Sequence, residues 1–426
     1  MHNIKVHKID PKEEEIQKGG IAQYNPLLDG TPEKCGDIIS SILVSMDNDD
    51  GNNKGNSYFV NAGVRAIRNI VILLKVMYPK VYNTNPTLDD VLALLNDFDK
   101  VVPLVEEMKK DPYLNKRWRT IIVYFETRFY PVPTDDKGKP IFGARLGSKR
   151  AKTEKSIEGI VNQLDNFLGR EEIRYILCDR ENSISLEEVL ENGDCLAIAS
   201  RQAELGDKLG KAFALFFILS IQNAVLSRYS EDENPTIPHF ILIDEFPFYL
   251  NDSTKTFFSF SRKYNCSINV VIQNMAQLRE VSDEFRQIIF TNTGTKILLG
   301  GINAEDQKYW SDLFGTEEKL ELQTGFSQNP LLSENGKMTE SIRGSIKESA
   351  KVTTQELNEL EFKNVYCMYK NNKGERVVAK GYTDFLNISD KKEDKEYFNF
   401  EKFNKNSFKP ITNVEEPKKE TFENIE

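Results

Sequence analysis

Two adjacent carboxylates, Asp244 and Glu245, directly follow the apolar run Phe240-Ile241-Leu242-Ile243. Such a run is typical of a strand buried on both faces, as in a parallel sheet. Because a carboxylate is costly to remove from water, paired acids there indicate a cation or a water at the carboxyl-terminal edge of the sheet. The chemistry predicted is nucleotide hydrolysis, in which the first acid holds Mg²⁺ and the second orients the attacking water. The alternative is structural, with Asp244 capping the next turn and Glu245 facing solvent.

A glutamine follows the next predicted strand. Residues 252–263 predict a helix, and residues 267–272 predict a second buried strand that ends at Gln273. A strand, helix and strand of these lengths form a parallel unit with a right-handed crossover. We therefore expect Gln273 beside the two acids, where its amide would bond a γ-phosphate and the lytic water. A glutamine that only satisfies a turn is the alternative.

The remaining elements must position this edge, and they predict an α/β fold. Downstream, we expect a helix at 275–291, a strand at 295–300, a helix at 304–314 and a hairpin of strands 365–369 and 376–385. Upstream, we expect strands at 1–10, 175–178 and 195–199, a helix at 185–190 and a buried core helix at 207–228. Residues 57–77 and most of 86–172 predict helices, and Thr87 followed by acids is a typical helix start. A polar loop at 47–56 and a mobile loop at 316–352 complete the expectation.

The segments ILIDEFPFYL, FFSFSRKYNCSINVVIQNMAQL, IIFTNTGTKILLGG and YWSDLFG resemble the C-terminal half of TraG-type coupling proteins, the hexameric ATPases of conjugative type IV secretion. The resemblance runs from about residue 20 to residue 385 and implies a RecA-like motor domain, mostly a parallel sheet, with an inserted all-α domain. By this resemblance Asp244 and Glu245 match the Walker B acids, and Asp244 would hold Mg²⁺. Gln273 matches the sensor glutamine, and Arg262 would act on ATP in a neighbouring subunit. The alternative for Arg262 is a helix-end cation.

The phosphate-binding loop G-x-x-x-x-G-K-[ST] does not occur in the 426 residues. Two partial matches begin at Gly143 and Gly206; the first has the wrong spacing, and in the second Ala212 replaces the Mg²⁺-binding hydroxyl. We expect that both partial matches arise by chance, because neither directly follows a buried strand. The resemblance implies that the loop, the first strands and a membrane anchor precede residue 1. We therefore expect negligible ATPase activity from the isolated chain.

The resemblance also divides the chain into domains and implies partners. We expect a truncated motor domain at 1–80, an all-α insertion at 81–172, the rest of the motor at 173–386 and a disordered charged tail at 387–426. The implied partners are relaxase-bound single-stranded DNA, type IV secretion channel proteins and five further copies in a hexamer. The implied location is the cytoplasm, at the inner face of the membrane.

Composition limits how the chain binds DNA. A net charge of −10 argues against binding through overall charge, so contacts must be local. The candidates, some interleaved with Trp118 and Tyr124, are Lys116, Arg117, Arg119, Arg145, Lys149 and Arg150. Aromatics beside cations could stack bases, although a solvated face over core aromatics gives the same pattern. The five scattered cysteines and three histidines predict neither disulfides nor a metal site.

Two functions of different classes remain open. The first is a coupling-protein ATPase that moves DNA toward a secretion channel, or a related ATPase of channel assembly. The second is a non-catalytic module that binds cargo, or a partner chain that supplies the phosphate loop.

Overall fold

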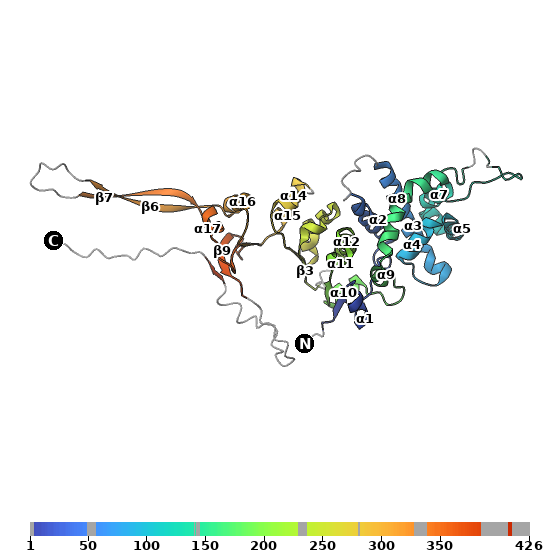
Figure 1. Cartoon of the computed structure of the whole chain (residues 1–426), viewed down its shortest axis with the longest axis horizontal. Coiled ribbons are helices and arrows are strands. Elements are labelled where there is room, and N and C mark those ends of the chain that lie inside the picture. Colours follow the sequence, from blue (N-terminus) through green and yellow to red (C-terminus); the bar gives the residue numbers. More distant parts are fainter. Residues whose placement is uncertain are drawn as a thin grey trace, which may run out of the picture. The chain divides into compact units, whose positions relative to one another are not determined.

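The computed structural model describes residues 4–48, 57–139, 141, 145–228, 237–279, 282–327, 339–384 and 408–410. These residues form two compact units with a boundary between Val271 and Ile272. Figure 1 labels many of the helices and strands of both units.

The first unit begins with a strand and then consists mainly of helices. The helices are α1 (Glu13–Lys18), α2 (Pro32–Asn48), α3 (Ser57–Tyr82), α4 (Leu88–Asn96), α5 (Val101–Lys110), α6 (Pro112–Arg117), α7 (Arg119–Arg128), α8 (Arg150–Leu168) and α9 (Glu171–Leu177), with the 3₁₀ turn η1 (Phe98–Lys100) after α4. Helix α3 packs against α2, α4, α5 and α8. Its residues Ile67, Ile70, Val71 and Leu74 are fully buried, as their helical spacing predicts. Thr87 forms a capping box with Asp90 at the start of α4, which confirms the predicted start.

Parallel strand pairs follow in the same unit. Strand β1 (Val6–Ile9) pairs with β2 (Cys195–Ile198), and β3 (His239–Ile243) pairs with β4 (Cys266–Val270). The helices α10 (Leu186–Asn192), α11 (Gln202–Leu205) and α12 (Asp207–Leu226) flank β2 in sequence. Between β3 and β4 the chain forms η2 (Phe246–Tyr249), η3 (Asp252–Thr254), α13 (Lys255–Phe260) and η4 (Ser261–Tyr264).

Helix α12 is the buried core helix that the sequence predicts. By length and composition it is the one helix among the described residues that could cross a membrane, yet 61% of its apolar window is buried in the protein. Phe213, Phe216 and Phe217 on this helix are fully buried. Phe216 stacks on Phe167 of α8, so α12 joins the helical region to the strands.

The second unit is built on an antiparallel sheet. It contains α14 (Ala276–Arg279), α15 (Asp283–Asn292), β5 (Lys296–Leu299), α16 (Ala304–Phe314), β6 (Thr316–Ser327), β7 (Thr339–Ala350), α17 (Thr354–Asn358), β8 (Asn364–Lys370), β9 (Arg376–Tyr382) and β10 (Phe408–Pro410). One sheet has the order β10-β9-β8-β5, and β6 pairs with β7 in a separate hairpin. Leu298, Trp310, Phe314, Tyr366 and Met368 belong to its core.

Several expected elements are wrong. Residues 175–178 do not form a strand but largely end helix α9, because Ile173, Ile176 and Leu177 are buried at helical spacing after two acids in the first turn. The expected mobile loop at 316–352 contains the long antiparallel hairpin β6–β7. Strand β5 is antiparallel to β8, so it does not extend the parallel series. The helix expected at 252–263 is divided into η3, α13 and η4, and the one expected at 275–291 into α14 and α15.

Other expectations are confirmed or lie outside the described residues. The hairpin around Lys373 is formed by β8 and β9, with Gly374 at φ 81° in the turn. Residues 49–56 of the expected polar loop lie outside the described residues. So does the expected disordered tail, except for residues 408–410, which pair with β9 as strand β10.

Candidate nucleotide-hydrolysis site

The two acids lie where the sequence places them, directly after β3. Both Asp244 and Glu245 are exposed, between the buried end of β3 at Ile243 and the buried ring of Phe246. The backbone N–H of Phe246 donates to the carbonyl of Val271 at 3.1 Å, which fixes the turn to the end of β4. The Asp244 Oδ1 atom accepts the Glu245 backbone N–H at 3.0 Å. The acids are therefore anchored at both ends but open to a ligand.

Glu245 has a left-handed backbone, with φ 48° and ψ 39°. A residue with a Cβ atom pays about 1–2 kcal/mol in this region. Such strain persists only where the surroundings impose it, and it is concentrated at functional sites. Here the anchored turn between β3 and Phe246 imposes it. The structural alternative, in which Asp244 caps the turn and Glu245 only faces solvent, does not require this left-handed backbone.

The face of the β3–β4 pair differs from the expectation. Phe240 and Leu242 are 80% and 72% exposed, so β3 is not buried on both faces. Alternate residues of a strand point to opposite faces, and only the face with Ile243 is covered. The apolar run predicts the strand correctly, but it does not predict what covers each face.

Gln273 follows β4, as the sequence predicts. Strands β3 and β4 are parallel with Ile243 opposite Val270, and the Val271 N–H donates to the Ile243 carbonyl at 3.0 Å. Gln273 is exposed and belongs to the second unit. Its backbone N–H donates to Oε1 of Gln277 at 3.2 Å. The side chain that satisfies this turn is therefore that of Gln277, and the approach of Gln273 to the acids stays a prediction.

Arg262 lies in η4, the short turn before β4, and is exposed. Within the described part of the chain it has no carboxylate partner at ion-pair distance. Its carbonyl accepts the N–H of Asn265 at 3.3 Å, which leads the chain into β4. Because Arg262 is exposed and unpaired there, its guanidinium is accessible from outside the unit, as a role in a neighbouring subunit would require.

A partly buried ion pair that sequence reasoning missed lies after the ends of β1 and β2. Asp10 follows β1 and is 2% exposed, and Arg201 follows β2. The Nε and Nη2 atoms of Arg201 donate to the two carboxylate oxygens of Asp10, both at 2.7 Å. This pairing holds the pKa of the Asp10 carboxyl below its ordinary value. Asp10 directly follows β1 and Arg201 comes three residues after the end of β2, but the two residues are 191 positions apart, so no local pattern in the sequence predicts their pairing.

A second contact connects this ion pair to the acids. The Ser200 hydroxyl, next to Arg201, lies 2.7 Å from the hydroxyl of Tyr249 in η2. Tyr249 follows the acids by four residues. The ends of β1, β2 and β3 thus carry polar groups that are linked by hydrogen bonds and short turns.

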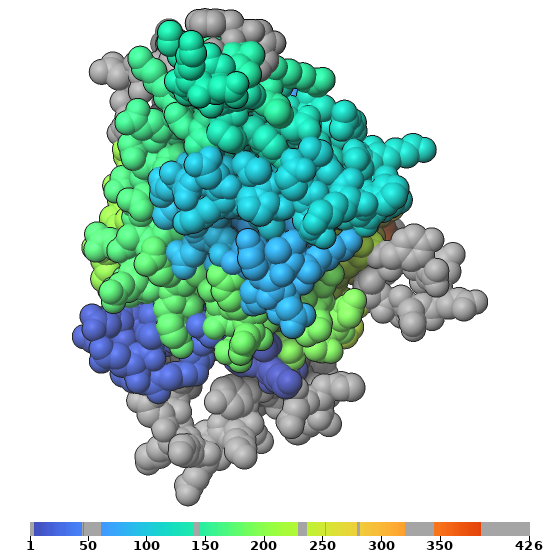
Figure 2. All heavy atoms as spheres, turned by 90° about the vertical axis from the view of Figure 1, so that its right-hand side faces the viewer, coloured from blue at the N-terminus to red at the C-terminus, as the bar shows by residue number. Residues whose placement is uncertain are grey.

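The candidate DNA contacts lie on the helical region of the first unit, which Figure 2 shows from one side. Lys116, Arg119, Arg145 and Lys149 are exposed. Arg117 lies 3.7 Å from Glu33 and donates to the Tyr113 hydroxyl. Trp118 and Tyr124 are 8% and 4% exposed, so they cannot stack bases, and the core alternative for these aromatics is correct.

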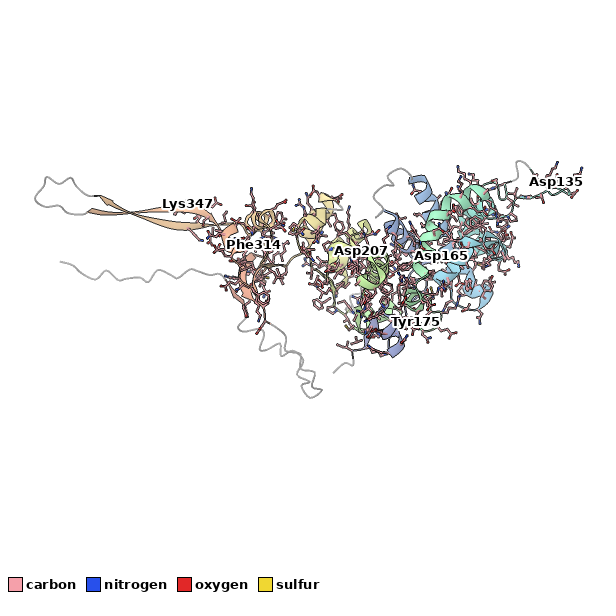
Figure 3. The ribbon with its side chains drawn as sticks, viewed as in Figure 1. Asp135, Asp165, Tyr175, Asp207, Phe314 and Lys347 are labelled. Carbon is pink, nitrogen blue, oxygen red and sulfur yellow. The ribbon has the colours of Figure 1, made fainter. Side chains whose placement is uncertain are left out.

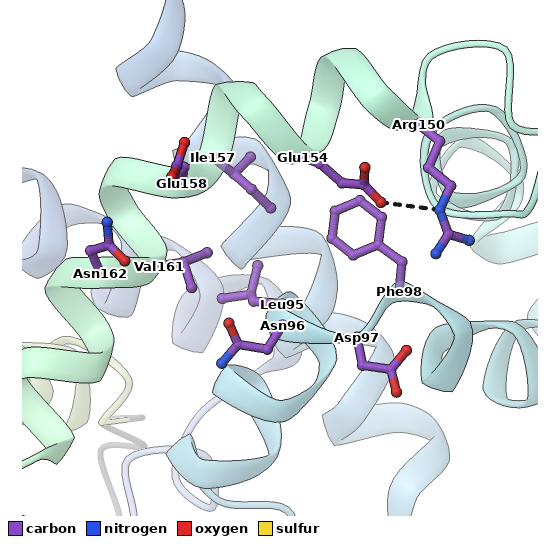
Figure 4. Close-up of a pocket in the computed structure, with 10 residues that line it drawn as sticks. All are labelled: Leu95, Asn96, Asp97, Phe98, Arg150, Glu154, Ile157, Glu158, Val161 and Asn162. Carbon is purple, nitrogen blue, oxygen red and sulfur yellow. Dashed lines mark hydrogen bonds and ion pairs between the residues drawn. The ribbon is translucent and has the colours of Figure 1, made fainter.

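Arg150 has a structural environment of its own, which Figure 4 shows. It borders a small pocket between α4, η1 and α8, with Phe98 and Glu154 among the lining residues. Its guanidinium pairs with Asp99 at 2.6 Å and with Glu154 at 3.1 Å, and it lies over the Phe98 ring. Two carboxylates already neutralise Arg150, so a DNA phosphate would have to displace them.

The acids fit one part of a magnesium–nucleotide site. Mg²⁺ in such sites is held by one or two carboxylates together with substrate phosphates and water, and Asp244 offers an exposed carboxylate. The described residues contain no group of three or more His, Cys, Asp or Glu side chains that could hold a metal without a ligand. The phosphate-loop motif, with its lysine, does not occur in the 426 residues.

Comparison with known proteins identifies similar families and folds. Residues 238–362, which include both acids, match the family described as the TraM recognition site of TraD and TraG. The unbound monoclinic form of the bacterial conjugative coupling protein TrwBdeltaN70 is similar in structure, with a TM-score of 0.57 and 13% identity over 90% of this chain and 75% of that chain. The plasmid coupling protein TrwB in complex with ADP and Mg²⁺ gives 0.54 and 12% over 90% and 76%. None of the curated proteins matches the sequence. The expected RecA-like α/β fold is confirmed.

Proposed function

We propose that this chain, a TraG-type coupling protein by the match of residues 238–362 and by its fold, supplies the hydrolytic acids of a conjugative DNA-transfer ATPase. The observation that carries the proposal is the exposed acid pair after β3 inside the family match, with Glu245 held in a left-handed backbone. In this role Asp244 holds Mg²⁺ and Glu245 orients the attacking water. Gln273 contacts the γ-phosphate, and Arg262 acts on the nucleotide of a neighbouring subunit.

The cofactors and partners of this proposal follow from the family. Bound ATP with Mg²⁺ would supply the phosphoryl group whose transfer to water drives the motor. The similar TrwB structure holds ADP and Mg²⁺, which supports this choice. The assembly is a homo-hexamer at the cytoplasmic face of the membrane, and it delivers relaxase-bound single-stranded DNA to the type IV secretion channel.

A specific observation favours a second function. The phosphate-loop motif does not occur in these 426 residues, so we propose that the isolated chain has negligible ATPase activity. In that state the chain acts as a module that binds cargo, or it joins a polypeptide that supplies the loop. A secretion-channel assembly ATPase is a weaker alternative, because the family match is to coupling proteins.

The test of the proposed function is conjugative transfer from donor cells. We expect deletion of the coding sequence to abolish transfer of the element, and the wild-type gene in trans to restore it. Assembly of the secretion channel, measured by pilus or channel-protein levels, should remain normal in the deletion. Loss of the channel itself would instead support the assembly ATPase, and normal transfer would refute both.

A further inference from the structure

The hairpin of β6 and β7 extends from the rest of the second unit. Its two strands pair with each other over their whole length and form a separate two-stranded sheet. The Lys351 N–H donates to the Gly315 carbonyl at 2.9 Å and closes the base of the hairpin, directly after α16. In Figure 1 both strands extend from this base away from α16 and α17, and Figure 3 shows Lys347 of β7 apart from the core residue Phe314. Because a two-stranded hairpin alone is marginally stable in water, a partner that covers it would stabilise it.

The strand register divides the residues of this hairpin between two faces. Alternate residues of a strand belong to opposite faces, and directly opposite residues share a face. Leu320 is opposite Ile346 and Phe326 is opposite Glu340, so these four residues belong to one face, which we call the apolar face. The large apolar residues of the apolar face are Leu320, Leu322, Phe326, Ile342 and Ile346.

The charges of the hairpin are also divided between its faces. The charged residues of the apolar face are all acids: Glu318, Glu340 and Glu348. The cations of the two strands all belong to the opposite face: Lys319, Arg343 and Lys347. Glu318 lies directly opposite Glu348, and like charges in this position destabilise a sheet. A cation from outside the hairpin would relieve this repulsion.

Solvent reaches the part of the apolar face next to the base. Ile346 is 71% exposed, and Glu318 and Glu348 are exposed beside it. Exposed apolar surface rimmed by polar residues is typical of interaction sites. The hairpin therefore offers an apolar stripe with acids at both ends, Glu318 and Glu348 near the base and Glu340 at the far end.

The charges of the apolar face determine which occupant it fits. Acids without cations repel the phosphates of nucleic acids and of anionic lipids, and a second copy of the same face would bring acids against acids. We infer that the apolar face binds a basic segment of a partner protein, whose apolar centre covers the stripe and whose cations meet the acids at its ends. The stripe from Leu320 to Phe326 is about 20 Å long at 3.4 Å per residue. This inference does not depend on the proposed function, because the hairpin takes no part in ATP hydrolysis there.

The experiment measures binding of a fluorescently labelled peptide, KKLTLTLTLKK, to the full 426-residue protein by anisotropy. The control peptide EELTLTLTLEE has the same apolar centre and opposite charge. We expect a Kd below about 0.1 mM for the basic peptide and binding at least about tenfold weaker for the acidic one. Equal affinity for the two peptides would contradict the role of the acids.

Two pairs of variants locate the site on the apolar face. Glu318→Gln with Glu348→Gln should weaken binding of the basic peptide about fivefold, because two exposed ion pairs are lost. Its control, Glu317→Gln with Glu321→Gln, removes the same charge from the opposite face and should leave the Kd unchanged.

The second pair tests the apolar stripe. Ile346→Asn should weaken binding of the basic peptide about tenfold or more, because an apolar side chain is no longer buried by the peptide. Its control, Ser345→Asn, places the same residue on the same strand but on the opposite face and should bind as the wild type does. The fluorescence of Trp310, in the core of this unit, verifies that the variants fold.

Three outcomes would overturn the inference. Failure of the basic peptide to bind the wild-type protein would exclude the site, and equal losses in each variant and its control would assign binding to overall charge or to hairpin stability. If Ile346→Asn left peptide binding intact but reduced the size of the protein in sedimentation, the occupant would be a second copy of this chain. Because none of these measurements involves transfer, a failure here leaves the proposed function intact.

Discussion

The left-handed backbone of Glu245 predicts that removing its Cβ atom stabilises the protein. Glu245→Gly removes the Cβ strain of about 1–2 kcal/mol. It also adds about 0.5–1 kcal/mol of unfolded-state entropy. The Glu245 side chain is exposed, so its removal leaves no cavity in the core. The net expectation is a gain of about 0.5–1 kcal/mol in the free energy of unfolding. Glu245→Ala keeps the strain and should leave stability nearly unchanged.

The assay must report on the first unit alone. The chain has two tryptophans, Trp118 in the first unit and Trp310 in the second. In a Trp310→Phe background, the fluorescence of buried Trp118 follows unfolding of the first unit in urea. Asn265 offers a matched control, because it is also left-handed, at φ 52°. Asparagine tolerates this region better than glutamate, so Asn265→Gly should gain less than Glu245→Gly.

A specific result would refute this reasoning. If Glu245→Gly were less stable than Glu245→Ala, the turn after β3 would not be strained as the structure indicates. The argument that the anchored turn holds Glu245 in a strained backbone would then fail, although the acids would remain at the end of β3.

Two further predictions concern stability. Arg201→Ala leaves Asp10 buried without its bidentate partner and should lower the free energy of unfolding by about 2 kcal/mol. The control Glu14→Ala breaks an exposed pair with Lys12 and should change the free energy of unfolding by less than about 0.5 kcal/mol. Urea titrations compare the two variants. Because the pKa of Asp10 is lowered in the folded protein, the stability that its charge contributes is complete above the unfolded pKa near 4 and is lost as pH falls through the folded pKa. The loss of stability in Arg201→Ala should therefore shrink in acid. A loss that does not change with pH would contradict this. Thr87→Ala removes the capping box of α4 and should lower the free energy of unfolding by about 1 kcal/mol. The control Thr120→Ala, on the exposed side of α7, should leave it unchanged or raise it slightly. Equal effects of the two substitutions in urea titrations would contradict the role of the cap.

The sequence predicts the elements whose pattern is local. The capping residues of α4, the apolar spacing of α3 and the turn at Gly374 determine those elements by themselves. The acids after β3 are equally predictable, because an apolar run that ends in charge needs only neighbouring residues to interpret.

What the sequence does not predict depends on tertiary contacts. Residues 175–178 are apolar enough for a strand, but burial at helical spacing selects α9. The polar, alternating residues of β6 and β7 resemble a loop until the two strands pair over twelve residues. The pair of Asp10 and Arg201 joins residues 191 positions apart, which no local pattern can reveal. The exposed face of β3 likewise depends on what packs there.

The central claim is that Glu245 activates water in a conjugative motor, and one measurement tests it most directly. Transfer frequency is measured from donors in which the only copy of the chain carries Glu245→Gln, with protein levels verified. The substitution keeps size and hydrogen bonding but removes the basic carboxylate, so we predict a fall of about a hundredfold or more. Transfer at the wild-type frequency would contradict the account.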